Sequence, residues 1–251
     1  MNILKKIKSK LPIVIEKRDN HKYFILGNKK AYLETNCFNK SYSHDGNDAV
    51  LLTYYEENQN YKGFYIDLGA LHPKHFSNTQ LFYEKGWSGI NIDATPGSME
   101  LFRKMRKRDI NLEAGVSEKQ DELIYYIFEE SALNSFDLNL SEQRIRDGWV
   151  LKDKKKIKTF PINYLLDKYM PINTHHIDFI DIDIEGFELQ ILESLDFSKY
   201  APDFFLIEDL YFAYNDIFEC KNSPIFHFLN NKGYILIAKT KKSFIYQKGE
   251  R

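Results

Sequence analysis

Residues 64–70, FYIDLGA, decide the fold: a run of apolar residues ends in an aspartate, and a glycine follows almost at once. A short apolar run of this kind is typical of a buried strand in a parallel sheet. Gly69 allows the backbone to turn tightly after the strand, and the small Ala70 lets a ligand approach the main chain. In an open parallel sheet, ligands bind beyond the carboxyl ends of the strands, where the strand order reverses. The residues that end each strand are therefore the first candidates for a functional site.

On the carboxyl-terminal side of this stretch, apolar runs alternate with helical segments, which predicts a mostly parallel sheet flanked by helices. We expect strands at 64–68, 89–93, 111–116, 177–183, 203–208, 234–239 and 243–247. We expect helices at 78–85, 96–107, 163–169, 186–195 and 224–231. Only a short polar segment separates the last two strands, so they should pair antiparallel at one edge. The predicted fold class is α/β, with a doubly wound, Rossmann-like sheet of seven strands.

Local signals mark several helix ends. Ser77 and Gln80 have the spacing of a capping box. Thr95 precedes a proline, the arrangement expected where a capping hydroxyl opens a helix. Gly86 and Gly233 are natural stops for the helices before them.

The remaining segments lie outside this regular pattern. Residues 1–60 are expected to form an N-terminal cap, and residues 61–251 one compact catalytic domain. The cap would hold short strands at 13–16, 23–26 and 31–33, then a helix at 48–57 capped by Asn47. Residues 119–160 fit the alternation least well. They read as an insertion over one end of the sheet, with a strand at 123–128 and a polar loop at 131–148.

Composition excludes several classes of protein. The formal net charge is −1 with a pI near 6.7, whereas proteins that grip nucleic acid usually carry a basic excess. Cys37 and Cys220 lie far apart and form neither a disulfide framework nor a zinc motif. The apolar run at 11–15 is too short for a secretory signal, and no run of 18 apolar residues exists. We expect a cytoplasmic protein without a membrane span and without nucleic acid as its main partner.

The first two strand ends predict a nucleoside site. Asp93 ends the second strand, 26 residues after Asp67, where an acidic side chain can accept both hydroxyls of a ribose. After Gly69, the residues up to His75 include no further glycine, so the backbone lacks the close approach that a pyrophosphate needs. A ligand without phosphates, such as S-adenosylmethionine, suits this turn better than NAD.

Carboxylates crowd the later strand ends. Alternation along the strand puts Asp181, Asp183 and Glu185 on one side, and Glu208 and Asp209 end the next strand. The negative charges of these carboxylates repel one another unless a cation lies between them. That cation could be the sulfonium and amino group of S-adenosylmethionine or a divalent ion. The structural alternative is that these are solvated strand ends and that the nearby Glu188 simply favours a helix N-terminus.

His72 and His75 follow the first strand, and a histidine near neutral pKa is a suitable base for a hydroxyl. Of the two, His72 is slightly favoured because it follows the turn more directly. Packing of both histidines, or capping of the following helix, is the alternative.

Taken together, these segments resemble the FkbM family of methyltransferases. The resemblance spans roughly residues 41–210 and lies in FYIDLGALHP at 64–73, FSNT at 76–79, GWSGINID at 86–93, IDFIDIDIEG at 177–186 and LIE at 206–208. The element I-D-x-E-G-x-E is the most specific of these. The family implies a class I methyltransferase fold, and its members commonly methylate hydroxyls of sugars or natural products, often for surface glycans.

The resemblance also implies cofactor-binding positions. The methionine end would contact Asp67, Gly69, Ala70 and Asp181. The ribose would contact Asp93 and Ala94, and the adenine would contact Gly115, Val116 and Ser117. Ser43 belongs to a stretch, 41–44, that would help to close this site. More distant similarity to metal-dependent sugar O-methyltransferases implies a Mg²⁺ or Mn²⁺ site at Asp183, Glu208 and Asp209.

The predicted function is transfer of a methyl group from S-adenosylmethionine to a hydroxyl of a sugar or sugar nucleotide, with His72, His75 and Asp183 as candidate catalytic residues. The expected setting is synthesis of a capsule or lipopolysaccharide glycan. One rival is a hydrolase or nuclease that uses Asp181, Asp183 and Glu208 around metal ions. That rival leaves Asp93 and the Gly69 turn without a role. The other rival is a non-catalytic adenosine-binding scaffold.

Overall fold

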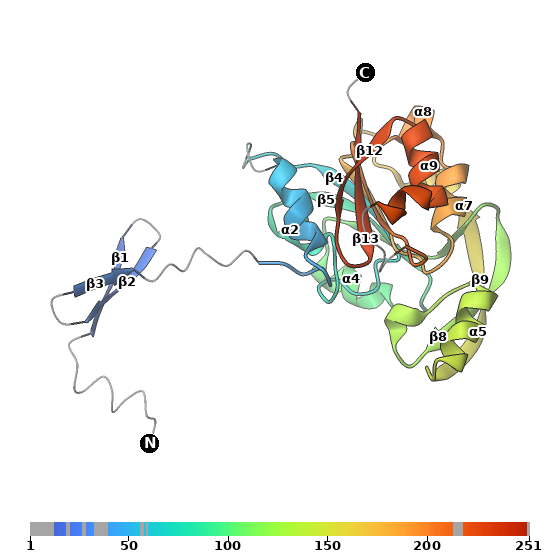
Figure 1. The fold of residues 1–251 in the computed structure, drawn as a ribbon, viewed down its shortest axis with the longest axis horizontal. Coiled ribbons are helices and arrows are strands. Elements are labelled where there is room, and N and C mark those ends of the chain that lie inside the picture. Colours follow the sequence, from blue (N-terminus) through green and yellow to red (C-terminus); the bar gives the residue numbers. More distant parts are fainter. Residues whose placement is uncertain are drawn as a thin grey trace. The chain divides into compact units, whose positions relative to one another are not determined.

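The computed structural model describes residues 13–18, 21–26, 29–32, 40–55, 58, 60–212 and 218–249, the first three ranges at the level of the backbone. The chain divides into two units, residues 1–40 and 41–251 (Figure 1). In the first unit, β1 (Ile13–Arg18), β2 (His21–Leu26) and β3 (Lys29–Tyr32) form an antiparallel sheet in sequential order. These three strands match the three short strands expected there. Cys37 lies outside the described residues.

The second unit is built on a sheet of seven strands. These are β4 (Phe64–Leu68), β5 (Ser88–Asp93), β6 (Ile110–Glu113), β10 (Phe179–Ile182), β11 (Phe204–Glu208), β12 (Tyr234–Lys239) and β13 (Ser243–Lys248). The order across the sheet is β12-β13-β11-β10-β4-β5-β6. β4, β5, β6, β10 and β11 run parallel, and the order reverses between β4 and β10. This confirms the predicted Rossmann-like sheet and places the ligand-binding crevice of such folds beside β4.

The predicted antiparallel pair is also confirmed. β13 pairs antiparallel with both β12 and β11, so β12 is the edge strand and runs parallel to the rest of the sheet. The turn between β12 and β13, residues 240–242, therefore lies at the carboxyl end of β11, beside the predicted site.

Helices cover both faces of the sheet. The helices before the insertion are α2 (Asn47–Leu52), η1 (Thr53–Tyr55), α3 (Gln80–Glu84) and α4 (Met99–Met105). The helices after it are α6 (Ile162–Tyr169), α7 (Glu188–Ser194), α8 (Phe197–Tyr200), η3 (Glu219–Asn222) and α9 (Pro224–Asn231). α6, α7 and α9 pack on one face, against Ile66 and Ile180. α2 and α3 pack on the other, against Tyr65 and Phe179. Cys220 is buried in the first of these cores.

Some helix boundaries differ from the sequence prediction. Ser77 Oγ accepts a hydrogen bond from the Gln80 amide at 3.1 Å, but the Gln80 side chain turns to Glu84, so only half of the capping box forms. Asn47 is the first residue of α2 rather than its cap, because Gly46 takes that position with φ 83°. Thr95 does not cap α4, which begins at Met99. Gly86 and Gly233 do end their helices, with φ of 96° and 85°.

The insertion is more regular than predicted. It contains β8 (Asp121–Phe128), η2 (Ser131–Leu133), α5 (Leu138–Arg146) and β9 (Leu151–Pro161). The sequence analysis missed β9, a strand of 11 residues. The predicted strand at 111–116 divides: β6 stays in the main sheet, and β7 (Gly115–Ser117) joins β9 and β8 in a second sheet of order β7-β9-β8. Figure 1 shows this insertion standing out from the main sheet.

Candidate active site

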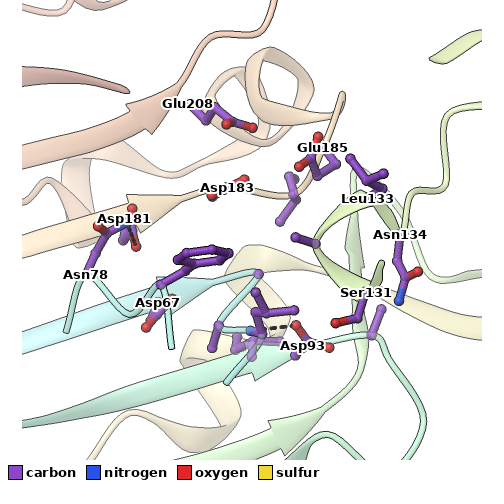
Figure 2. A pocket seen from close by; sticks show the side chains of 18 of the residues that line it. Asp67, Asn78, Asp93, Ser131, Leu133, Asn134, Asp181, Asp183, Glu185 and Glu208 are labelled. Carbon is purple, nitrogen blue, oxygen red and sulfur yellow. Dashed lines mark hydrogen bonds between the residues drawn. The ribbon is translucent and has the colours of Figure 1, made fainter. Parts of the chain in front are cut away.

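A cavity of about 370 Å³ lies at the carboxyl ends of β4, β5, β10 and β11 (Figure 2). This volume falls in the range of small-molecule sites. One wall comes from the strand ends, a second from residues 44–47 and the β12–β13 turn, and a third from η2 and neighbouring residues of the insertion. The cavity thus gathers segments that are far apart in the sequence.

Period-2 alternation explains why acidic groups meet here. Tyr65, Phe179 and Leu206 face the core beneath α2 and α3. Two residues further along the same strands, and therefore on the same face, are Asp67, Asp181 and Glu208. The strands thus begin apolar under the helices and end acidic in the cavity.

The Gly69 turn is fixed by its neighbours. Gly69 has φ 86°, and a Cβ placed on it would lie 1.8 Å from the backbone oxygen of Asp183. No residue other than glycine fits this contact. The amides of Gly69 and Ala70 donate to the oxygen of Ile92 at 2.9 and 3.1 Å, so the turn is held against β5.

Asp93 closes the other side of this turn. Its buried carboxylate accepts hydrogen bonds from the amides of Leu71 at 2.9 Å and Thr95 at 2.7 Å, one on each oxygen. Burial raises the pKa of Asp93, and the two amides act against that rise. Since each carboxylate oxygen has two lone pairs, both oxygens can still accept a ligand hydroxyl.

Asp67 and Asp181 lie side by side in register on β4 and β10. Asp67 Oδ2 accepts from the Thr79 hydroxyl at 2.7 Å, and Asp181 Oδ2 accepts from the Asn78 amide at 2.8 Å. Asp181 Oδ1 is buried and has no hydrogen-bond partner among the described residues. Burial raises the pKa of Asp67 to about 6, and burial together with the charge of Asp67 raises that of Asp181 well above its usual range. The pair therefore offers an unsatisfied acceptor that a cationic donor would stabilise.

A buried arginine supports Asp67 from behind. Arg106 is fully buried and donates to Asp109 at 2.9 Å, to the Tyr65 hydroxyl at 2.7 Å and to the Thr79 hydroxyl at 3.0 Å. Thr79 in turn donates to Asp67. The guanidinium lowers the pKa of Asp67 in opposition to burial. The sequence analysis did not identify Arg106, because an arginine near the end of an amphipathic helix is ordinarily exposed.

A second group of carboxylates lies at the end of β11 and just beyond the end of β10. Asp183, Glu185 and Glu208 bring carboxylate oxygens within 4.8 Å of one another. Glu208 Oε1 pairs with Lys242 at 3.2 Å, and Glu185 pairs with Arg144. Glu208 Oε2 is buried and lacks a hydrogen-bond partner in the described part of the chain. Figure 2 shows these three side chains directed toward one another.

The titration of this group is perturbed by burial. Burial, followed by the charge of Glu208, raises the pKa of Asp183 well above its usual range. The same two causes raise the pKa of Glu185 to about 8, against the effect of Arg144. Strand β10 ends at Ile182, and Glu185 has φ 60°, so Glu185 reaches the group through a turn rather than through strand alternation.

Asp209 and Glu188 have local structural partners. The Asp209 carboxylate accepts from the Ser223 hydroxyl, and Asp209 does not join the group of three among the described residues. Glu188 Oε1 accepts from the amides of Ile184 at 3.1 Å and Gly186 at 3.0 Å. Glu188 is the first residue of α7, the position near a helix N-terminus that the structural alternative gave it, and its bonds hold the turn that precedes the helix. Burial raises the pKa of Glu188 to about 7.

Neither His72 nor His75 is among the described residues that line the cavity. His72 Nδ1 accepts from the amides of Lys74 at 3.1 Å and His75 at 2.9 Å, so this ring closes the loop that carries it. Burial, with a smaller effect of His75, lowers the pKa of His72. The ring of His75 stacks on Phe76, which does line the cavity. The ring of His72 thus closes its own loop and the ring of His75 packs on Phe76, while the helix that follows, α3, has Thr79 at its N-cap.

Of the other predicted cofactor-binding residues, some line the cavity and some do not. Ala70, Ala94 and Val116 line the cavity. Gly115 packs against Phe136 and Thr159, and the Ser117 hydroxyl contacts Thr159. Ser43 donates to Asp48 at 2.9 Å, and the neighbouring His44 lines the cavity instead.

The insertion, which the sequence places over one end of the sheet, supplies one wall of the cavity. Asn134 donates to the Thr95 hydroxyl at 3.2 Å, and Tyr125 contacts the same hydroxyl, which ties the insertion to the end of β5. Trp149, half exposed, also lines the cavity. Figure 2 shows Ser131, Leu133 and Asn134 across the cavity from Asp67 and Asp181. The sequence analysis read residues 131–148 as a polar loop over one end of the sheet, and it did not show which of these residues reach the cavity.

Comparison with known proteins gives a family. Residues 67–236, about two thirds of the chain, match the family model described as the methyltransferase FkbM domain. A solved structure, methyltransferase FkbM from Methylobacillus flagellatus KT, is similar at 16% sequence identity with a TM-score of 0.42. The similarity covers 86% of this chain and 46% of that one, so this chain spans less than half the length of that protein. The search of the curated proteins found no match. On the match to two thirds of its length, the chain belongs to the FkbM methyltransferase family.

Proposed function

We propose that this protein transfers a methyl group from S-adenosylmethionine to a hydroxyl oxygen of a sugar or sugar nucleotide, in the synthesis of a surface glycan. The observation that carries the proposal is the buried, unpartnered oxygen of Asp181 beside Asp67. An unsatisfied buried carboxylate oxygen is costly, and a ligand ammonium group would satisfy it. Family membership supports methyl transfer.

The cavity has residues that fit each part of this cofactor. Asp181 and Asp67 would hold the amino-acid end, and the oxygens of Asp93 would accept the ribose hydroxyls. Gly69 gives the ligand access to the main chain because it has no side chain. Val116, beyond the β6 strand, would contact the adenine. When bound, the cofactor supplies an electrophilic methyl group on its sulfonium.

Asp183 is the proposed proton acceptor for the hydroxyl. It lines the cavity next to Glu208, whereas the rings of His72 and His75 lie outside the lining. A carboxylate whose pKa is raised toward neutrality is a stronger base than an exposed one, and general-base assistance contributes ~10²–10⁴ in rate. Lys242 and Arg144 pair with the neighbouring glutamates, whereas Asp183 has no ion-pair partner among the described residues.

The proposal includes a divalent cation, Mg²⁺ or Mn²⁺, bound by the second group of carboxylates. Asp183, Glu185 and Glu208 offer the hard oxygen ligands that these ions prefer, with Glu185 in the place that the sequence analysis gave to Asp209. Such an ion would compete with Lys242 for Glu208. Chelation therefore decides whether the cation of this site is a metal ion or Lys242.

The acceptor would enter past the insertion. The indole of Trp149 and the rings of Phe76 and Phe136 line the cavity, and such rings stack well on sugars. Nucleotide-linked sugars are the first acceptors to screen, with formation of S-adenosylhomocysteine as the readout.

The test compares Asp183→Asn with His72→Ala on the acceptor found in that screen. Asp183→Asn should lower kcat by ~10²-fold or more and leave the Kd for S-adenosylhomocysteine within about threefold, since a base acts in the transition state. His72→Ala should keep kcat near the wild-type value. A large loss of kcat in His72→Ala, with kcat near the wild-type value in Asp183→Asn, would instead identify His72 as the base. Cofactor binding without turnover on any acceptor would support the scaffold, and metal-dependent phosphodiester cleavage would support the hydrolase.

A further inference from the structure

The insertion carries a basic strand that the proposed chemistry does not use. β9 contains five lysines, at positions 152, 154, 155, 156 and 158, and all five are exposed. Residues 146–158 hold six basic and two acidic residues, a formal charge of +4, in a chain whose net charge is −1. Positive charge is therefore dense along this strand, although the chain as a whole is close to neutral.

These lysines form a continuous ribbon. The antiparallel register sets Lys154, Lys156 and Lys158 opposite Tyr126, Ile124 and Glu122 of β8, so the three lysines share one face. Ile124 is 46% exposed on that face, between the lysines. Lys156 and Lys158 have no ion-pair partner within the ranges that the structure describes. The other edge of residues 151–158 is unpaired in the described chain, because β7 reaches only Thr159–Pro161.

Exposed apolar side chains adjoin the ribbon where it begins. Trp149 is 49% exposed and Val150 is 55% exposed, immediately before β9. Trp149 also lines the cavity. Exposed apolar and basic side chains therefore follow one another along residues 149–158, and Trp149 joins this segment to the cavity lining.

We propose that this surface, residues 149–158 with Ile124, docks on an anionic lipid membrane. Lysines attract the negative surface potential of such a membrane, and half-exposed tryptophan and aliphatic side chains enter the headgroup region beside them. A free phosphate ligand would need a concave site with converging donors, whereas these lysines lie along an extended strand. The apolar side chains also distinguish this surface from one that only attracts charge.

Docking would bring the cavity mouth to the membrane, since Trp149 belongs to both surfaces. This step rests on the proposed function: the acceptor would then be a sugar attached to a lipid at the membrane surface. The binding itself does not depend on methyl transfer, so the two are tested separately.

The experiment measures binding of the full chain to vesicles by sedimentation. Vesicles of phosphatidylcholine with 30% phosphatidylglycerol, about a third anionic lipid, are compared with pure phosphatidylcholine. The wild type should bind the anionic vesicles, and added salt should weaken the binding because it screens charge. Each lysine near such a surface contributes about fivefold, so replacing Lys154, Lys156 and Lys158 by Gln should weaken binding ~100-fold.

Two matched controls each remove three lysines elsewhere. Replacement of Lys104, Lys107 and Lys221 by Gln should change vesicle affinity less than about threefold. Replacement of Lys5, Lys6 and Lys8 tests the basic N-terminal segment in the same way. Binding that follows either control set rather than the ribbon would overturn the proposal.

Trp149 provides a reporter at the docking surface itself. The chain has two tryptophans, and Trp87 is buried. Anionic vesicles should shift the emission of the wild type to shorter wavelength, and Trp149→Phe should abolish the shift. Absence of vesicle binding at low salt, or binding to an anionic oligonucleotide in place of vesicles, would refute membrane docking. The ribbon variant should still methylate a water-soluble acceptor at the wild-type rate, so that loss of docking is not confused with loss of the proposed activity.

Discussion

Replacement of Asp181 by asparagine tests the centre of the proposed cofactor site. The substitution keeps the size of the side chain and leaves one oxygen to accept from Asn78. The other position, now an amide, would turn a donor toward the cavity, where the carboxylate presents an unpartnered acceptor. A hydrogen bond to a charged group contributes about 1.5–3 kcal/mol, so affinity for S-adenosylhomocysteine should fall ~10- to 100-fold.

The same change should stabilise the protein without ligand. Burial and the neighbouring Asp67 raise the pKa of Asp181, so the folded state holds its proton more tightly than the unfolded chain does. Ionisation therefore costs folding free energy, and the cost grows as the pH rises above the unfolded value of 3.8. At pH 8, Asp181→Asn should raise the free energy of unfolding by about 1 kcal/mol or more, measured by urea denaturation.

Asp178→Asn is the matched control, at the residue that immediately precedes the same strand. Asp178 is also buried, but both of its oxygens accept hydrogen bonds, from the Tyr61 hydroxyl at 2.6 Å and the Phe64 amide at 2.7 Å. Burial raises the pKa of Asp178 as well, but asparagine can accept at only one of these two positions, so loss of a buried hydrogen bond opposes the gain from removing the charge. Asp178→Asn should therefore stabilise the protein less than Asp181→Asn does, and it should leave ligand affinity unchanged. An Asp181→Asn protein that binds S-adenosylhomocysteine within threefold of the wild type would refute the assignment of Asp181 to the cofactor's ammonium group.

Further predictions concern the turn, the ribose, the pH dependence and the metal. Gly69→Ala should lower the free energy of unfolding by at least about 2 kcal/mol in urea, because it adds a backbone collision to a left-handed conformation. Gly148→Ala, also left-handed but with open space around it, should cost only about 1 kcal/mol. Asp93→Ala should weaken S-adenosylhomocysteine binding in calorimetry by about 1–3 kcal/mol, with no binding of NAD to either protein. Burial raises the pKa of Glu188 from 4.5 to about 7, so in this range the folded state keeps a proton that the unfolded chain loses; the urea stability of the wild type should fall between pH 4.5 and 7, and Glu188→Gln should reduce the fall. Removal of divalent ions by EDTA should abolish turnover and added Mn²⁺ restore it; full activity in EDTA would leave Lys242 as the cation of the site.

The strand ends of the site could be predicted because they follow from alternation. Asp67, Asp93 and Asp181 each end a short apolar strand, and a period of two fixes the face on which each lies. The parallel order then brings those ends to one edge of the sheet. These residues needed no information beyond the local sequence and the fold class.

The insertion could not be predicted in the same detail. β9 reads Leu-Lys-Asp-Lys-Lys-Lys-Ile-Lys-Thr-Phe-Pro, and its exposed first part has no apolar alternation to indicate a strand. Its pairing with β8 creates the strand, and β8 itself was recognised. The assignment failed because a ribbon with little buried surface leaves no periodic signal.

Contacts between distant segments were also beyond the sequence. Lys242 was read only as part of a polar turn, and its pairing with Glu208 arises because β13 inserts between β11 and β12. Asn78 lies in a helix-start signal, and nothing local indicates that its amide reaches Asp181. His72 seemed a base because it follows the turn, whereas its ring accepts amides of its own loop.

The contact between Gly69 and the backbone of Asp183 has a consequence for engineering. The loop that would hold the methyl donor and the residue that would accept the proton meet main chain to main chain, without intervening side chains. Alignment at the reacting atoms is then a property of the sheet, while the wall facing the acceptor comes from residues 119–160. An exchange of that insertion between relatives should therefore transfer acceptor preference as a module, with the donor-side geometry carried over intact.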